Sequence, residues 1–397
     1  MEPFSRRALL LTAPALLVPT ALALSSAQTA AATAAKLTFR ISNGSDLNQT
    51  LYLYVMGTDL GTGRLGYVDP AGNFQPWPAG SIPPSPAPDA SMLGPGIGGT
   101  TSVLVPRGFS GRLYLAFGSK LDFRLTPDGL VQPDAANPPD PNYNILFDFT
   151  EFTYNDQGLW LNSSQVDMFA IPHAVTVTAQ NGSVKRSGQL VAQGRNNVVQ
   201  QIQALPDWQR SVIKRSDGTV LRVLSAGKAT GVGLLDSGYL DSEINRAWNT
   251  YVNTPLTVRP FTDQPNIVFT GRTSGNVMNF TDSSGNFAAS FNKPSSANVW
   301  NCDGNLFAPN DQVVGPIART LGAALNRSTL ADNSQQPALN AGTYYQNART
   351  NHYARIIHAN MANGNAYAFP FDDVGGFESL VYDPDPLSAG IEIGPFN

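Results

Sequence analysis

The sequence is poor in cysteine. Cys302 is the single cysteine among 397 residues, so no disulfide can form within the chain and the fold must be stabilised by burial of apolar side chains. Hydrophobic residues make up 42% of the sequence, which is enough for a sizeable core. We expect Cys302, in the segment VWNCDGN, to be a small residue packed in a turn, because a catalytic thiol needs a histidine close by.

Charged residues and histidines are also scarce. Charged side chains make up 14% of the chain, the net charge is −4 and there are three histidines. A nucleic-acid partner requires a basic stripe that displaces counterions from phosphates, and the sequence has none. The scattered histidines do not indicate a metal site, and no phosphate loop, dinucleotide fingerprint or GxSxG motif is present. The sequence therefore predicts no metal, no other cofactor and a neutral ligand such as a polysaccharide.

Long apolar runs are confined to the N-terminus. The segment SRRALLLTAPALLVPTALALSSAQTAAATAA begins with Arg6 and Arg7, continues with apolar residues and ends in small residues that resemble cleavage sites. We predict that residues 1–35 are a signal peptide of the twin-arginine type and that the protein is secreted. The alternative is a membrane anchor, but Pro14 and Pro19 interrupt the apolar run, whose length is marginal for a bilayer span. No later segment indicates a membrane partner.

Glycine and proline, by contrast, are abundant, with 36 and 30 residues. Between their clusters lie short runs rich in β-branched and aromatic residues, such as KLTFRISN, GRLYLAFG and HAVTVTAQ, which are typical of half-buried strands in a sandwich or barrel. Two long Pro/Gly-rich loops, 75–99 and 126–142, interrupt this pattern, and loops of that length usually border a functional face.

The pattern changes after about residue 183. Three segments show apolar residues at helical spacing: NNVVQQIQALPDWQRSV, LDSEINRAWNTYVN and DQVVGPIARTLGAALNRSTL, the last with Asp311 as a candidate N-cap. The tail, YAFPFDDVGG and ESLVYDP, is predicted to turn strand-rich and to return to the first sheet. The expected fold is mainly β: a β-sandwich or barrel lobe from residues 36–183 and 341–397, a mixed α/β lobe from residues 184–340, and a wide cleft between them.

Acidic residues stand out in the strand-like segment DFTEFTYNDQGLWLNSSQVDMF (148–169). Because side chains alternate along a strand, Glu151 shares a face with Thr153 and Asn155. The turn NDQG predicts a hairpin, and we expect Glu151 to pair with about residue 164 and Asp167 to lie one pair further along. Such neighbours are roughly 5–8 Å apart.

Two opposed carboxyl groups suit hydrolysis of a glycosidic bond. A separation of roughly 5–5.5 Å lets the second carboxylate act as a nucleophile, whereas about 6.5–9.5 Å leaves room for an attacking water. The predicted register does not choose between these mechanisms, and both acids could instead be solvated strand residues.

Several of these motifs resemble one enzyme family. TEFTYNDQGLWLNSSQVDMF, VWNCDGNLFAPND with AALNRSTL, and YAFPFDDVGG are similar to segments of the glycoside hydrolase family 64 β-1,3-glucanases, which in turn resemble thaumatin-like proteins in fold. The resemblance implies a secreted, inverting endo-hydrolase that cuts β-1,3-glucan, such as laminarin or curdlan, and releases laminaripentaose. The absence of disulfides departs from the thaumatin-like pattern.

The resemblance also implies roles for individual residues. Glu151 matches the general acid and Asp167 the general base, and their separation of 16 residues agrees with the family's catalytic pair. Five further residues match groups that contact the sugar chain: Thr153, Asn155, Trp160, Asp372 and Asp373. In this interpretation Glu151 holds a proton at the working pH, next to apolar Phe149 and Phe152, and Asp167 stays ionised.

A second class of function is a non-catalytic, thaumatin-like protein that binds β-glucan. Binding requires aromatic and amide groups but no opposed acids, so oligosaccharide release from laminarin distinguishes the two hypotheses. In both, the partner is β-1,3-glucan and the protein is expected to be a monomer.

Overall fold

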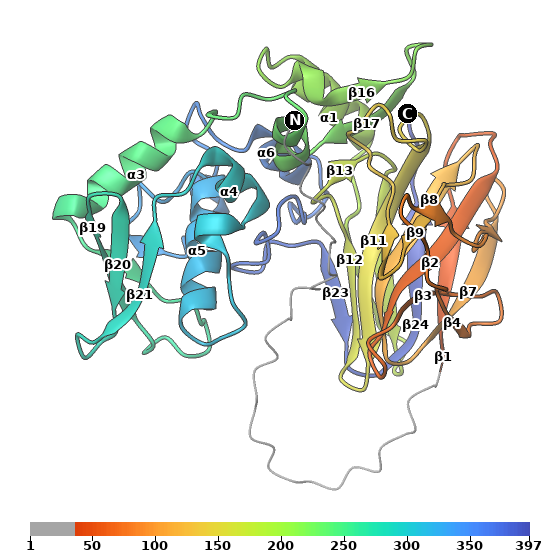
Figure 1. Ribbon diagram of the computed structural model, residues 1–397, viewed down its shortest axis with the longest axis horizontal. Coiled ribbons are helices and arrows are strands. Elements are labelled where there is room, and N and C mark those ends of the chain that lie inside the picture. The colour runs from red at the N-terminus through yellow and green to blue at the C-terminus, as the bar shows by residue number, and fades with distance from the viewer. Residues whose placement is uncertain (1–35) are drawn as a thin grey trace, which may run out of the picture. The chain divides into compact units, whose positions relative to one another are not determined.

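The structure is a computed structural model that describes residues 36–397. The predicted signal peptide, residues 1–35, lies outside the described residues. The described chain divides into two compact units (Figure 1). Unit 1 contains residues 36–163, 171–189 and 380–396, and unit 2 contains residues 164–170 and 190–379 with the last residue.

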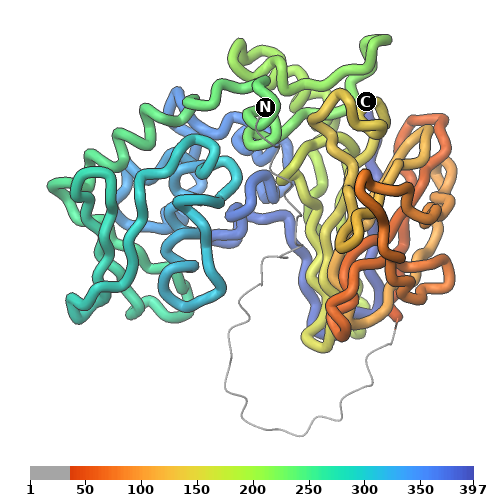
Figure 2. Tube along the Cα trace, in the orientation of Figure 1, coloured from red at the N-terminus to blue at the C-terminus, as the bar shows by residue number. Residues whose placement is uncertain are grey.

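Unit 1 is built from β-sheets. Its five-stranded sheet has the order β15 (Val184–Ser187), β14 (His173–Ala179), β24 (Pro386–Ile393), β1 (Lys36–Asn43) and β7 (Thr100–Pro106). The C-terminal strand β24 therefore lies between β14 and β1 and runs parallel to β1, which Figure 2 shows as a blue strand among strands from the first half of the chain. The two ends of the described chain thus close one sheet.

The larger sheet of unit 1 carries the predicted acidic hairpin. Its order is β23 (Leu380–Asp383), β12 (Gly158–Ser163), β11 (Leu146–Asn155), β8 (Phe109–Phe117), β2 (Leu51–Asp59), β3 (Leu65–Val68) and β4 (Phe74–Pro76), with β6 (Met92–Leu93) beside β2. A small sheet of β10 (Gly129–Val131), β9 (Arg124–Thr126) and β5 (Ser85–Pro86) forms from the two long Pro/Gly-rich loops.

The core of unit 1 lies between its two main sheets. Phe39 on β1 and Phe152 on β11 are buried with their ring centroids 5.1 Å apart, and Phe109 lies 5.9 Å from Phe152. Each such buried ring contributes roughly 1.5–3 kcal/mol relative to an exposed one. One face of β11 therefore points into the sandwich, and the alternate residues, including Glu151, point to the other face of the sheet.

Unit 2 mixes helices with short strands. Its helices are α1 (Gly194–Gln203), α2 (Ala226–Gly231), α3 (Asp241–Asn253), α4 (Ser296–Asn301), α5 (Val314–Asn326) and α6 (His352–Ala359), with 3₁₀ turns η1 (Gln209–Ser211), η2 (Gly304–Leu306) and η3 (Ala341–Thr343). One sheet has the order β21 (Phe287–Asn292), β20 (Val277–Thr281), β19 (Phe269–Ser274), β18 (Leu256–Val258) and β22 (Gln335–Gln336). The other has the order β13 (Met168–Phe169), β17 (Val220–Leu224) and β16 (Val212–Lys214).

The three predicted helices are present as α1, α3 and α5, so the mainly β fold class with a mixed α/β insertion is confirmed. The N-cap of α5 is Val313 rather than the predicted Asp311, but Asp311 lies just before it and its Oδ1 accepts hydrogen bonds from the backbone N–H groups of Val313 and Gly315 at 2.9 Å. These are among the donors that a helix leaves without intrahelical partners.

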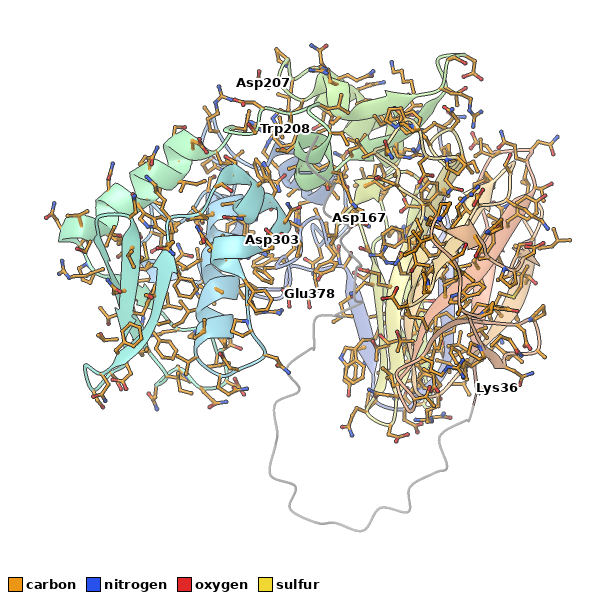
Figure 3. All side chains as sticks on the ribbon, viewed as in Figure 1. Lys36, Asp167, Asp207, Trp208, Asp303 and Glu378 are labelled. Atoms are coloured by element: carbon orange, nitrogen blue, oxygen red, sulfur yellow. The ribbon has the colours of Figure 1, made fainter. Side chains whose placement is uncertain are left out.

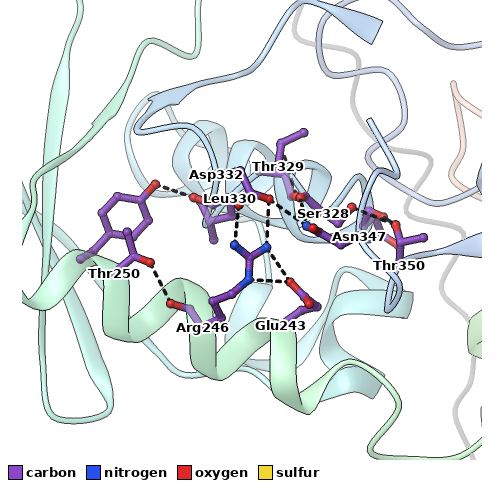
Figure 4. Close-up of polar contacts among 12 residues, drawn as sticks. Glu243, Arg246, Thr250, Ser328, Thr329, Leu330, Asp332, Asn347 and Thr350 are labelled. Atoms are coloured by element: carbon purple, nitrogen blue, oxygen red, sulfur yellow. Dashed lines mark hydrogen bonds and ion pairs between the residues drawn. The ribbon is translucent and has the colours of Figure 1, made fainter. Parts of the chain in front are cut away.

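A network of polar contacts joins α3 to the segment after α5. Arg246 on α3 donates to Glu243 on its own helix and to both carboxylate oxygens of Asp332 (Figure 4). Asn347 also donates to Asp332, at 2.8 Å. Arg246 and Asp332 are far apart in sequence, so this network links α3 to the segment that follows α5 within unit 2.

Two expectations for the C-terminal region differ from the structure. Unit 2 extends to Ser379 rather than ending near residue 340. Helix α6 packs on α1, and Arg327, which follows α5, donates hydrogen bonds to the carbonyls of Val374 and Asp372 in the loop after α6. The segment YAFPFDDVGG forms turns rather than a strand, since its carboxylates and carbonyls bond to side chains of unit 2. ESLVYDP does return to the first sheet, as β23.

Candidate active site

The acidic hairpin forms as predicted, but its register differs. Asn155 pairs with Gly158, and Glu151 lies directly opposite Asn162 rather than residue 164. Gly158 has a φ of 119°, and a Cβ there would lie 2.3 Å from the carbonyl oxygen of Asp383 on the next strand. Glycine is therefore required where this tight turn meets β23.

The predicted face of β11 is confirmed. Glu151, Thr153 and Asn155 are half-buried, whereas the intervening Phe152 and Tyr154 are buried. Phe152 packs in the sandwich core, so the expectation that it forms an apolar wall beside Glu151 is wrong. The alternation places Glu151 on the face opposite to that core.

Glu151 is held by an arginine on the neighbouring strand. Arg112 on β8 pairs directly with Glu151 in the sheet register. Its Nε and Nη2 donate to the same oxygen, Oε1, at 3.1 and 3.0 Å. The guanidinium also lies over the ring of Phe149, 4.0 Å from the centroid. Within the described part of the chain, no group donates to Oε2, which is therefore available to carry a proton.

The three residues expected to line sugar subsites lie on this sheet. Thr153 shares a hydrogen bond of 2.8 Å with the hydroxyl of Ser110. The Oδ1 atom of Asn155 accepts from the backbone N–H of Gln157 in the turn, so its amide nitrogen is the group left for a ligand. Trp160 is half-buried, pairs with Thr153 across the ladder and lies 4.7 Å from the ring of Tyr382.

A depression of about 360 Å³ lies beside Arg112 in unit 1. It is lined by residues from β2, β3, β8 and β10 and from the loops after β4 and β10: Met56, Gly57, Leu65, Gly66, Trp77, Arg112, Tyr114, Leu130 and Gln132. Trp77 is mostly covered, with 8% of its surface exposed, and packs against Tyr67.

Asp167 does not lie on the hairpin. Strand β12 ends at Ser163, whose hydroxyl donates to the carbonyl of His173, and Ser164 bridges to Tyr367 in unit 2. Asp167 occupies a bend before β13, so the expectation that it shares a strand face with Ser163 is wrong. The two predicted catalytic acids belong to different compact units, and the hairpin register does not determine their separation.

Within unit 2, Asp167 (labelled in Figure 3) lies beside Lys228 of the short helix α2. Its Oδ1 is 3.5 Å from Nζ of Lys228 on α2, and its carbonyl accepts from the backbone N–H of Ser225. About 28% of the Asp167 side chain is exposed. A nearby cation and access to water both favour an ionised carboxylate.

Asp372 and Asp373 are the remaining predicted site residues. Asp372 is fully buried; its oxygens accept from Arg327 at 3.0 Å and from the backbone of Ala368 at 2.9 Å, and it lies 2.9 Å from His358 Nε2. Burial opposes ionisation, yet His358 and Arg327 hold the pKa of Asp372 below its usual value. The same carboxylate raises the pKa of His358, although burial of the imidazole acts in the opposite direction. The Asp372 carboxylate is therefore buried, and its partners are the side chains of Arg327 and His358 and the backbone of Ala368.

Asp373 is more accessible than its neighbour. About 19% of its side chain is exposed, and it forms an ion pair with Arg319 on α5. Burial nevertheless raises the pKa of Asp373. Its Oδ1 is buried with no hydrogen-bond partner among the described residues, which agrees with the raised pKa, so the exposed part of the side chain is the part that a ligand can reach.

Sequence reasoning missed several residues around these acids. Arg112, Arg327 and Lys228 are isolated cations whose partners are distant in sequence, so no local pattern identified them. His358 had no assigned role but bonds to Asp372. Burial raises the pKa of Glu378 to about 7, with Asp373 and Asp372 adding to the effect. Cys302 caps α4 and is buried, as predicted for a packed turn residue.

No group of three or more His, Cys, Asp or Glu side chains suited to a metal occurs in residues 36–397. Over the same residues, no helix has the length and apolar character needed to cross a bilayer.

The sequence matches a known family almost from end to end. The β-1,3-glucanase family profile of glycoside hydrolase family 64 matches residues 35–393. A glucan endo-1,3-β-glucosidase from Arthrobacter sp. (strain YCWD3) is 43% identical over 394 residues, covering 99% of this chain and 71% of that protein. A glucan endo-1,3-β-glucosidase from Cellulosimicrobium cellulans matches to the same extent.

Solved structures agree with this assignment. The chain superposes with a TM-score of 0.89 on the crystal structure of a laminaripentaose-producing β-1,3-glucanase in complex with laminaritetraose, with 47% identity, covering 92% of this chain and all of that one. A family 64 β-1,3-glucanase domain from Clostridium beijerinckii gives a TM-score of 0.76 at 23% identity, which shows a common fold. The chain belongs to glycoside hydrolase family 64 and is a β-1,3-glucanase, as its motifs predicted.

Proposed function

We propose that this protein is a secreted, inverting endo-hydrolase that cuts β-1,3-glucan and releases laminaripentaose, with Glu151 as general acid and Asp167 as general base. The observation that carries the proposal is the 47% identity, over the full length of the matched chain, to a glucanase described as laminaripentaose-producing and as a complex with laminaritetraose. The paired Arg6 and Arg7 before an apolar stretch that ends in small residues support secretion.

The local chemistry supports the two roles. In inverting hydrolysis one carboxylic acid protonates the leaving oxygen while a carboxylate on the opposite side of the sugar activates a water. Glu151 uses one oxygen for Arg112 and keeps Oε2 for a transferable proton. Asp167, partly exposed and beside Lys228, is suited to remain charged and to accept a proton from water.

Chain connectivity also supports cooperation between the acids. Asn162 is the cross-strand partner of Glu151, and Asp167 follows Asn162 by five residues. Thr153, the amide of Asn155 and the Trp160 ring belong to the same hairpin as Glu151, and we propose that they bind glucosyl units next to the cleaved linkage. Asp373, whose side chain is about 19% exposed, is proposed to accept from a sugar hydroxyl, and Asp372 to position this segment.

Hydrolysis of laminarin by matched variants tests the proposal. Glu151→Gln and Asp167→Asn keep side-chain volume and remove proton transfer, and each is expected to lower kcat by about 10²–10⁴-fold. Asp156→Asn, a change to an exposed hairpin acid, should keep wild-type turnover. The products, separated by chromatography, should be mainly pentasaccharide. Near wild-type turnover in Glu151→Gln would refute the assignment of the acid.

A further inference from the structure

We propose that Arg112 is a positioning residue for the general acid, and that it is itself held by Gln132 and Tyr114 so that the transferred proton is carried by Oε2 of Glu151. This inference rests on the proposed role of Glu151. It adds residues from β8 and from the loop after β10, none of which is contiguous with the acidic hairpin in the sequence.

Arg112 contacts Glu151 through a single carboxyl oxygen. Both Nε and Nη2 of Arg112 donate to Oε1, at 3.1 and 3.0 Å. An arginine N–H can only donate, so Oε1 must offer lone pairs in the direction of the guanidinium. When Glu151 is protonated, the hydrogen therefore belongs on Oε2, which receives no hydrogen bond from the described residues. The arginine thus selects the oxygen that carries the transferable proton.

Arg112 is itself held in place by Gln132, which Tyr114 also contacts. Its Nη1 donates to Oε1 of Gln132 at 3.1 Å, and the Tyr114 hydroxyl donates to the same oxygen at 2.6 Å. Because arginine cannot accept, the amide oxygen of Gln132 must face it, which fixes the orientation of that amide. The guanidinium lies over Phe149 at 4.0 Å. Its plane and three of its nitrogens are therefore restrained.

Partial burial strengthens the effect of Arg112 on the orientation of Glu151. The Arg112 side chain is 15% exposed and that of Glu151 is 28% exposed, so this pair is partly shielded from water and holds a defined geometry better than a surface pair. A planar fork orients a carboxyl group in a way that a lysine ammonium cannot. Misplacement of an acid by about 1 Å can cost about 10²-fold in rate.

The test uses substrates that differ in their need for an acid. Cleavage of a glucan linkage releases a sugar alkoxide, which is a poor leaving group and requires protonation. Dinitrophenolate, by contrast, leaves from a dinitrophenyl laminarioligoside without protonation. Arg112→Lys is expected to lower kcat on laminarin by about 10–10²-fold and to change dinitrophenyl release little, with KM retained. Tyr114→Phe should give a smaller loss in the same direction. The control is Arg124→Lys, because Arg124 forms a similar two-nitrogen contact with Asp122 in the same unit.

Equal losses on laminarin and on the aryl substrate would mean a structural role for Arg112 and overturn the inference, as would wild-type activity of Arg112→Lys on laminarin. A Glu151→Gln variant that is fully active would instead refute the underlying assignment. If the wild type does not cleave the aryl substrate, the kinetics on laminarin decide: a fall in kcat with KM retained supports the inference, and a rise in KM with kcat retained overturns it.

Discussion

Glu378 provides a quantitative link between the structure and the pH dependence of stability. Burial raises the pKa of Glu378 (labelled in Figure 3) from 4.5 to about 7, and the carboxylates of Asp373 and Asp372 add to this effect. Its Oε2 is buried and has no hydrogen-bond partner in the described chain. The folded protein therefore prefers the neutral form of this side chain, whereas the unfolded chain ionises it at ordinary pH.

The direction of the effect follows from proton binding. Below about pH 4.5 both states carry the proton, and Glu378 has no pH-dependent cost. Between pH 4.5 and about 7 the unfolded chain has lost the proton and the folded protein keeps it, so stability falls as pH rises. At about 1.4 kcal/mol per pH unit, the cost reaches about 3 kcal/mol above pH 7.

We therefore expect Glu378→Gln to stabilise the protein at pH 8 by about 1–3 kcal/mol relative to wild type, and to have little effect near pH 4.5. The measurement is urea unfolding followed by circular dichroism from pH 4.5 to 8.5. The free-energy difference between the two proteins is the informative quantity, because contributions of other groups cancel in it.

Glu392→Gln is the matched control, since Glu392 pairs with Arg186 at a partly exposed site and should differ from wild type by less than about 1 kcal/mol at every pH. If the Glu378→Gln difference does not change with pH, the neutral buried carboxyl inferred from the structure is wrong.

Two further predictions concern the ion cluster and the aromatic subsite. Asp372→Asn leaves Arg327, whose side chain is 2% exposed, without its counter-charge, so the free energy of unfolding should fall by about 3–5 kcal/mol; Asp373→Asn, at a more exposed ion pair, should lose clearly less, and equal losses would contradict the assigned burial. Trp160→Ala removes a half-buried ring beside Tyr382 and should raise KM for laminarioligosaccharides about 2–10-fold with kcat largely kept, as expected for an aromatic contact of about 0.5–1.5 kcal/mol. A fall in kcat with unchanged KM would instead indicate that Trp160 acts in the chemical step.

Local sequence patterns correctly predicted the structural features that depend on neighbouring residues. The alternation of β11, the two-residue hairpin turn at Asp156 and Gln157, and the helical spacing of α5 all depend on neighbours in the sequence, and all are present. The predicted register was wrong by two residues, since Glu151 pairs with Asn162 and not with residue 164. The position of the turn depends on the close approach of Gly158 to β23, which the local sequence does not reveal.

Long-range contacts could not be read in this way. Asp167 left the strand because Ser164 pairs with Tyr367, about 200 residues later in the chain. Asp372 was predicted to contact the sugar chain, but its partners Arg327 and His358 come from the end of α5 and from α6. Arg112 carries no motif of its own. In each case the deciding partner is an ionic or backbone group that only the tertiary fold brings close.

The stereochemistry of the released sugar tests the central claim most directly. If Glu151 protonates the leaving oxygen while Asp167 activates water, the bond is cleaved in a single displacement and the configuration at the anomeric carbon inverts. Proton NMR recorded in the first minutes of laminarin hydrolysis should then show the α-anomer of the new reducing end, followed by mutarotation to the equilibrium mixture. Initial release of the β-anomer would contradict the account, because it requires a covalent intermediate and a nucleophilic carboxylate.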